Sequence, residues 1–128
     1  MVSNLINILR TCPNWSPHRA GIVAAGVETS FPITSGVSTS GVPTDGYDLV
    51  LVRFRTTGSP TGVTLRPLFW DEVGSLWVPD ADIAATAFTT TAGQFSFNSY
   101  GRRFYIALTA LAGGTNPTVD IEVAGYGL

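Results

Sequence analysis

The histidine and the cysteine are the most reactive side chains of this chain, and each occurs once. His18 and Cys12 both lie near the N-terminus, among prolines at positions 13 and 17. A hydrolase triad needs a histidine held between an acid and a nucleophile, and a catalytic cysteine needs a partner that lowers its pKa. The two side chains could approach each other, but their spacing matches no catalytic pattern. We therefore expect an inert thiol at Cys12 and no catalysis through His18.

The acidic residues other than Glu28 come as close pairs, which suggests either metal ligands or turn caps. These pairs are Asp45/Asp48, Asp71/Glu72, Asp80/Asp82 and Asp120/Glu122. Asp80 and Asp82 could hold calcium, which prefers several oxygen ligands, but the full calcium-loop signature is absent. We interpret the pairs as structural acids in turns, with Asp82 as a possible cap. Phosphate loops, dinucleotide fingerprints and zinc helices are also absent, so the sequence predicts no enzyme, no cofactor and no metal.

Aromatic residues offer a second kind of chemistry, the stacking of rings on sugars. Trp70 and Trp77 flank a predicted turn, and Tyr47 is expected near the same end of that strand pair. This arrangement is compatible with a glycan-binding site formed by Tyr47, Trp70 and Trp77. Aromatic side chains also anchor cores and subunit interfaces, and we prefer that interpretation for both tryptophans.

All side-chain cations other than a protonated histidine are arginine, because the chain contains no lysine. Arginine suits planar ion pairs and interface contacts. Arg53 and Arg66 are predicted to lie close together across a strand pair, with Arg55 next along. Like charges placed opposite each other are unfavourable, so each needs an anionic partner. The candidates are Asp120 and Glu122 of the same chain, or a carboxylate of a neighbouring subunit.

Two stretches with the period-two pattern of β-strands position these arginines and tryptophans. They span residues 47–55 and 63–70, and turn-forming residues between them predict a hairpin. One face of this hairpin is apolar and suits a core: Val50, Phe54, Leu65 and Phe69. The other face mixes apolar and cationic side chains: Leu49, Leu51, Leu68, Trp70, Arg53, Arg55 and Arg66. Such a mixed face needs a cover, either a second sheet of the same chain or a neighbouring subunit.

Further short strands are predicted on both sides of this hairpin. They cover parts of 21–33, then 75–79, 88–91, 94–98, 102–110 and 118–123, with a clear hairpin loop at 112–117. Seven or eight short strands separated by turn signals predict an all-β fold. We expect a single β-sandwich of jelly-roll-like type that spans residues 21–128.

Residues 1–20 form a different kind of segment, which we expect to be an N-terminal docking arm. Its apolar side chains fit a short helical stripe, although an extended arm is the alternative. A short apolar segment is only marginally stable as an isolated helix, so it must dock on its own domain or on another subunit. The expected contact residues of the arm are Leu5, Ile6, Leu9 and Trp15.

Overall composition excludes several classes of function. The formal net charge is -2 at pH 7, which argues against a general nucleic-acid binder. No apolar run reaches the length of a membrane span, and the N-terminus lacks the features of a signal peptide. We expect synthesis in the cytosol and no membrane partner.

Two stretches carry a resemblance to a known group of proteins. Residues 68–79 read LFWDEVGSLWVP, and residues 105–115 read YIALTALAGGT. Together they resemble small β-rich structural proteins of tailed bacteriophages, in which a strand, an acidic turn and a Trp-containing strand precede a final hairpin. The similarity covers roughly residues 47–128, and within the group the head decoration (cement) proteins are the most similar. The resemblance implies a trimer that sits on the capsid and grips the shell or its neighbours with terminal arms.

These observations together predict a non-enzymatic virion protein, assembled in the host cytoplasm, that binds and stabilises a phage head. Its expected partners are the major capsid protein and its own copies, arranged as a homotrimer. Subunit or capsid contacts are assigned to the arm residues above and to Leu49, Leu51, Arg53, Arg66 and Trp70. The alternative is a carbohydrate-binding module, a receptor-binding tip or a head-fibre domain.

Overall fold

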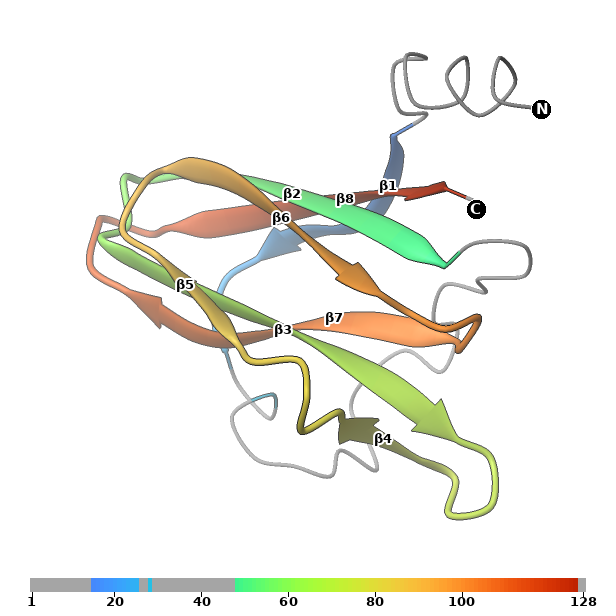
Figure 1. Cartoon of the computed structure of the whole chain (residues 1–128). Helices are drawn as coiled ribbons and strands as arrows, with labels where there is room; N and C mark the ends of the chain where they lie inside the picture. The colour runs from blue at the N-terminus through green and yellow to red at the C-terminus, as the bar shows by residue number, and fades with distance from the viewer. Residues whose placement is uncertain (1–14, 26–27, 29–47, 127–128) are drawn as a thin grey trace, which may run out of the picture.

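The structure, a computed structural model, describes residues 15–25, 28 and 48–126, and over these ranges it is an all-β sandwich. Two antiparallel sheets lie face to face (Figure 1). Sheet A has the order β1-β8-β2-β6, and sheet B has β3 at its centre, β7 along one side and β4 and β5 along the other. The strands are β1 (Ser16–Ile22), β2 (Leu49–Thr57), β3 (Gly62–Asp71), β4 (Leu76–Pro79), β5 (Thr86–Phe88), β6 (Ala92–Asn98), β7 (Phe104–Ala112) and β8 (Thr118–Tyr126).

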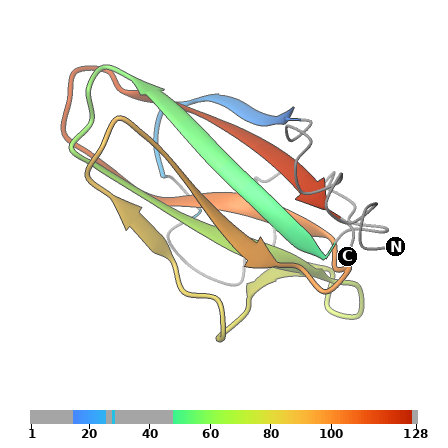
Figure 2. The same cartoon turned by 45° about the horizontal axis from the view of Figure 1, so that its top comes forward.

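The period-two pattern of each strand places one row of side chains between the sheets. In β2, Val50, Val52 and Phe54 are buried, while Leu49 and Leu51 on the other face are half-buried. The same alternation in β8 buries Val119, Ile121 and Val123. The core that results contains Val50, Val52, Phe54, Val63, Leu65, Phe69, Phe97, Phe104, Ile106, Leu108, Val119, Ile121 and Val123. The prediction of an all-β sandwich is therefore confirmed, and the two layers are seen from a second direction in Figure 2.

β3 is the central strand of sheet B even though it contains Pro67, which cannot donate to a ladder. β5 pairs with residues 63–65 of β3 and β4 pairs with residues 68–71, so Pro67 lies in the gap between them. On its other side Pro67 is opposite Ile106 of β7. The backbone N–H of Ile106 points away from β3, because it donates to His18. The proline is tolerated because no neighbouring strand needs its missing N–H.

The predicted hairpin between residues 47–55 and 63–70 is wrong. β2 lies in sheet A between β8 and β6, and β3 lies in sheet B, so the two strands are not paired. Their apolar rows do meet, but across the core rather than side by side. A period-two pattern shows that a strand has a core face and does not show which strand is its neighbour. In this chain, two core faces in opposite sheets bury each other.

The boundary between arm and domain also shifts. β1 begins at Ser16 and pairs with β8 through Ser16, Pro17, Arg19 and Ile22, so residues 16–20 belong to sheet A. The proposal of a docking arm is thereby confined to the residues before this strand. Residues 1–14 lie outside the described part of the chain.

Candidate functional site

The outer face of sheet A carries a contact that sequence reasoning did not anticipate. The guanidinium carbon of Arg53 lies 4.2 Å from the centre of the Trp15 ring, a cation–π contact between β2 and the residue before β1. Leu49 and Leu51 extend this face along β2 and are half-buried. The arrangement fixes the point at which the chain N-terminal to Trp15 meets the domain.

Glu122 of β8 is the anionic partner expected for the arginines of this face. It accepts a hydrogen bond from Arg53 at 2.8 Å and forms an ion pair with Arg55. The hydrogen bond from Arg53 lowers the pKa of the Glu122 carboxyl below its ordinary value. The other candidate, Asp120, accepts instead from the backbone N–H of Gly21 at 2.8 Å. Of the two alternatives left open by the sequence, an acid of the same chain or one of a neighbouring subunit, the structure shows the first for Arg53 and Arg55. The expected contact between Arg53 and Arg66 was wrong, because β2 and β3 belong to different sheets.

The outer face of sheet B holds the tryptophans in a small second core. Leu68, Trp77, Tyr105 and Ala107 are buried there, and Trp70 packs against them. The ring centres of Trp70 and Trp77 are 5.1 Å apart, and those of Trp77 and Tyr105 are 5.6 Å apart. Trp77 is only 2% exposed, so its ring presents no open platform for a sugar. Trp70 is half-buried, and Tyr47 lies outside the described residues.

The predicted contact residues accordingly do not form one surface. Leu49, Leu51, Arg53 and Trp15 share the outer face of sheet A, whereas Arg66 and Trp70 belong to β3 in sheet B. Leu5, Ile6 and Leu9 lie outside the described residues. The roles of all these residues in subunit or capsid contacts stay predictions.

The edge of β7 that faces away from β3 is covered by polar side chains, which we name the β7-edge cluster: His18, Arg19 and Glu28. The Ile106 N–H donates to His18 Nε2 at 3.0 Å, and Arg19 donates to the Ile106 carbonyl at 3.1 Å. Glu28 accepts from the Leu108 N–H at 2.8 Å and from the Tyr105 hydroxyl, and it pairs with Arg19 at 2.6 Å. Three backbone groups at the middle of this edge, the N–H and C=O of Ile106 and the N–H of Leu108, thus have side-chain partners.

Burial shifts the pKa values of His18 in this cluster and of the neighbouring Tyr105. Desolvation, assisted by the neighbouring Arg19 cation, lowers the pKa of His18 from 6.5 to about 4. His18 is therefore neutral at neutral pH, and its Nε2 is free to accept from Ile106. Burial, together with the hydrogen bond to Glu28, raises the pKa of the Tyr105 hydroxyl well above its ordinary value. His18 consequently works as a hydrogen-bond acceptor for the edge of β7.

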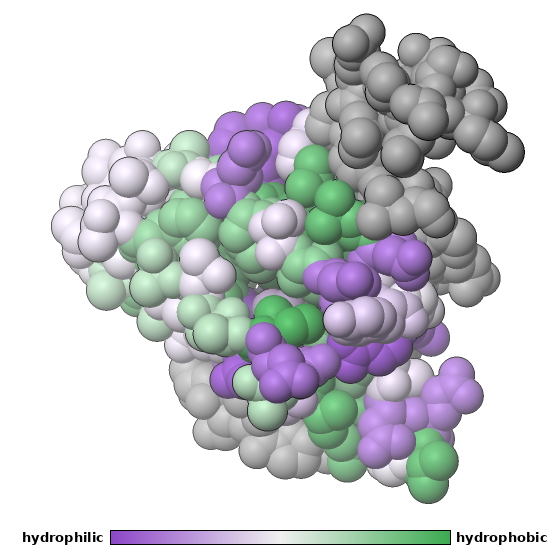
Figure 3. Space-filling model, in the orientation of Figure 1, coloured by the Kyte–Doolittle hydropathy of each residue, from purple (hydrophilic) through white to green (hydrophobic). Residues whose placement is uncertain are grey.

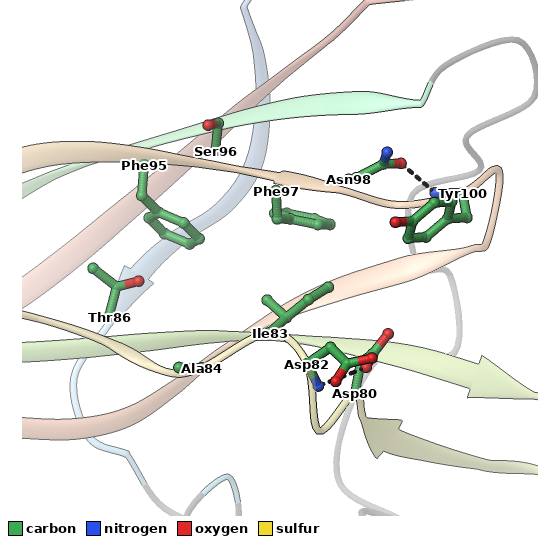
Figure 4. A pocket seen from close by; sticks show the side chains of 10 residues that line it. All are labelled: Asp80, Asp82, Ile83, Ala84, Thr86, Phe95, Ser96, Phe97, Asn98 and Tyr100. Carbon is green, nitrogen blue, oxygen red and sulfur yellow. Dashed lines mark hydrogen bonds between the residues drawn. The ribbon is translucent and has the colours of Figure 1, made fainter.

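The opposite side of the sandwich is hollowed into a groove of about 410 Å³, between β6 and the connection from β4 to β5. Figure 4 shows Phe95 and Phe97 pointing from β6 toward Ile83 and Thr86 on the far wall. Asp80, Asp82, Asn98 and Tyr100 gather at one end of the groove (Figure 4). In Figure 3, apolar surface follows the opening between the sheets, with hydrophilic patches beside it.

The acidic end of this groove is held in place by hydrogen bonds. Asp80 accepts from the Asp82 N–H and from Arg102, each at 2.9 Å. The bond from Asp82, followed by that from Arg102, holds the pKa of the Asp80 carboxyl below its ordinary value. The cap of this turn is therefore Asp80 and not Asp82.

Among residues 15–25, 28 and 48–126, no group of three or more His, Cys, Asp or Glu is arranged to hold a metal ion.

Sequence reasoning missed Glu28, Tyr105 and Tyr100. Glu28 had one available signal, since it is the acid without a neighbouring acid in the sequence. Tyr100 had another, because it precedes Gly101 in a short connection between two strands, where tight turns need residues of positive φ.

Comparison with known proteins identifies no family. No family model matches the chain, and no curated protein matches it. Among solved structures, the SPBc2 prophage-derived protein YomS is similar with a TM-score of 0.47 and 13% identity, over 91% of this chain and 96% of that one. The PBSX exported protein XepA gives 0.46 and 14% over 90% of this chain, which spans 39% of that protein. The Tobacco streak virus coat protein gives a TM-score of 0.40 and 12% identity, over 92% of this chain and 90% of that one.

Within the described residues, no helix has the length and apolar character needed to span a membrane.

Proposed function

We propose that this chain is a non-enzymatic structural protein of a virion, and more specifically a capsid decoration (cement) protein that stabilises a phage head. Its proposed partners are the major capsid protein and further copies of the chain in a homotrimer. The specific class and the trimer come from the sequence resemblance. The structure contributes a surface on which such contacts can form.

The observation that carries the proposal is the contact of Trp15 with Arg53 on the outer face of sheet A. This contact anchors the chain beside the half-buried Leu49 and Leu51, and the apolar residues Leu5, Ile6 and Leu9 precede it in sequence. Buried apolar surface contributes about 25 cal/mol per Å². Modest contacts of this kind, repeated over many copies in a shell, add to a large stabilisation.

The decisive experiment removes residues 1–14 and leaves β1 intact. We expect the shortened chain to stay folded, because the sandwich core is built from later residues, but to lose binding to isolated phage heads that lack the protein. Native mass from light scattering should fall from trimer to monomer. Val73→Ala is a matched control for an exposed apolar side chain, since Val73 is 99% exposed in a turn. Full occupancy of heads by the shortened chain would contradict the role of the arm.

The glycan-binding alternative receives less support from the positions of its residues. Trp77 is buried against Tyr105, and only Trp70 of the two tryptophans retains accessible surface. Loss of glycan binding in Trp70→Ala, with the fold intact, would favour this alternative over the structural role.

A further inference from the structure

The free edge of β6 differs from the other strand edges in the described part of the chain. β1 carries Pro17 and Arg19 and has two register shifts against β8. β4 and β5 are only 4 and 3 residues long, and the edge of β7 is covered by the β7-edge cluster. Natural proteins protect sheet edges by such means, namely proline, charge, bulges, short length or a cover. β6 (Ala92–Asn98) has 7 residues, no charge, no proline and no register shift.

The backbone groups at this edge point away from β2. The Thr91 carbonyl accepts from Thr56, and the Ser99 N–H donates to Asp48, so odd-numbered residues here face β2. Backbone groups of alternate residues in a strand point to opposite sides. Gln94, Ser96 and Asn98 therefore present their N–H and C=O groups to the open side. The outward carbonyl of Ala92 is taken by the Thr90 hydroxyl at 2.7 Å, which marks one end of the open edge.

We propose that the free edge of β6 binds an extended segment of another polypeptide chain, which adds to sheet A as a further strand. Strand addition of this kind uses main-chain hydrogen bonds for affinity and side-chain pockets for selectivity. The proposal goes beyond the decoration role and holds whether or not the chain coats a phage head.

The groove beside β6 defines the chemistry of the added segment. A strand next to β6 places alternate side chains over Phe95 and Ile83, which are half-buried and apolar. These positions suit aliphatic residues. The end near Asn98 carries Asp82, which is exposed, and Asp80, which already pairs with Arg102. Charge complementarity therefore selects an arginine or lysine at that end of the segment.

Tyr100 places an aromatic ring at the same end of the groove. It lies in the tight turn between β6 and β7, where its φ is +53° and the Arg102 N–H donates to the Ser99 carbonyl at 3.0 Å. The Arg102 guanidinium carbon lies 5.7 Å from the centre of the ring, and the residue is 71% exposed at the groove rim. A bound segment can therefore pack against the exposed part of this ring.

The test selects binders from a library of random heptapeptides displayed on yeast and measures the enriched peptides against the full chain and its variants. We expect the binders to alternate aliphatic and polar residues and to carry one arginine or lysine. Ser96→Pro removes an outward N–H without touching the β2 ladder, so it should weaken binding about tenfold or more. Ser96→Ala keeps that N–H and should stay within about twofold, while Asp82→Asn should cost about threefold.

Hydrogen exchange gives a second readout that does not depend on a variant. Binding should slow exchange at the amides of Gln94, Ser96 and Asn98, and leave those of Ile106 and Leu108 unchanged, since these are already bonded. If Ser96→Pro fails to fold, Gln94→Pro replaces it, because its N–H also faces outward.

Several results would overturn the proposal. The edge of β6 is not the binding site if the selected peptides bind both proline variants as tightly as the original chain. The same holds if the library yields no peptide whose binding these variants weaken. Self-association of the full chain that is lost in Ser96→Pro assigns the edge to a second copy instead. Binding on a glycan array that Tyr100→Ala abolishes and Ser96→Pro does not assigns the groove to a carbohydrate.

Discussion

The sandwich has two long sides, which we call the closed side (the edge of β7) and the open side (the edge of β6). They differ in the partners of the backbone groups at the strand edge. On one side, β1 lies beside β7, and His18, Arg19 and Glu28 bond the backbone groups of Ile106 and Leu108. On the other side, β6 faces the connection from β4 to β5 across a groove, and its alternate backbone groups point to the opening.

This contrast indicates that the two strand edges contribute differently to the protein, one to the stability of the fold and the other to possible contacts with partners. In the β7-edge cluster Glu28 is buried, while His18 and Arg19 are half-buried. The buried carboxylate of Glu28 is tolerated because Arg19, Tyr105 and Leu108 all satisfy it. The β6 side has no comparable cover within the described residues, where β6 pairs with β2 alone. Substitutions on the first side should therefore affect folding, and substitutions on the second should affect binding.

The largest effect is expected when the acid of the closed side is removed. Glu28→Ala leaves the Arg19 charge, the Tyr105 hydroxyl and the Leu108 N–H without their acceptor, which should lower the free energy of unfolding by about 3–5 kcal/mol. Asp82→Ala is the matched control on the open side, where an exposed acid should cost no more than about 0.5 kcal/mol. Urea denaturation measures both. Equal losses of stability in the two variants would show that the closed and open sides do not differ in their contribution to folding.

A smaller loss of stability is expected when the pH is lowered and His18 on the closed side takes up a proton. Unfolded His18 takes up a proton near pH 6.5, whereas the folded form does so only near pH 4. Between these values the unfolded chain holds more protons, so stability is complete above pH 6.5 and is lost as the pH falls toward 4. The loss should reach about 2–3 kcal/mol, allowing for partial exposure of the ring.

His18→Gln provides the control for this titration. The glutamine carbonyl can still accept from Ile106 but does not titrate, so the slope of stability between pH 6.5 and 4.5 should flatten. The lowered pKa values of Asp80 and Glu122 act at lower pH, below the ordinary values of 3.8 and 4.5. An unchanged slope in His18→Gln would show that another group controls the acid sensitivity.

The smallest effect on stability is expected at Tyr100 on the open side, where a substitution should raise the free energy of unfolding. Tyr100→Asn places a residue that tolerates the left-handed region in this turn, so stability should rise by about 0.5–1 kcal/mol. Tyr100→Ala keeps the unfavourable backbone conformation and should gain little. Thermal unfolding distinguishes the two variants. A loss of stability in Tyr100→Asn would mean that the ring packs usefully in the free protein.

Much of the fold could be predicted from local pattern. The alternation of Val119, Ile121 and Val123 gave β8, and the acidic pair at 120 and 122 was correctly offered as the partner of the arginines, since Arg53 and Arg55 meet Glu122. Asp71 and Asp80 are turn acids, because each accepts from backbone N–H groups that follow it. These features depend on neighbours in sequence or on alternation within one strand.

The sites were harder to predict because they join segments that are far apart in sequence. Glu28 meets Leu108, and the groove joins residues 80–86 to β6. The hairpin prediction failed for the same reason, since nothing in the β2 sequence distinguishes a neighbour in the same sheet from one across the core. The preferred interpretation of Trp77 as an anchor is confirmed for the core, but its partner Tyr105 in β7 could not be named from the sequence.

Local properties of the sequence are enough to predict a sandwich of short strands and the core-facing side chains of its strongly alternating strands. Both follow from turn residues and from the two-residue period. The surroundings of each sheet edge depend on the tertiary structure, because distant segments supply the partners of the backbone groups there. His18, Arg19 and Glu28 close one side in this way. On the other side, the segment that faces β6 across the groove contributes side chains to its wall, and no described strand pairs with the outer edge of β6.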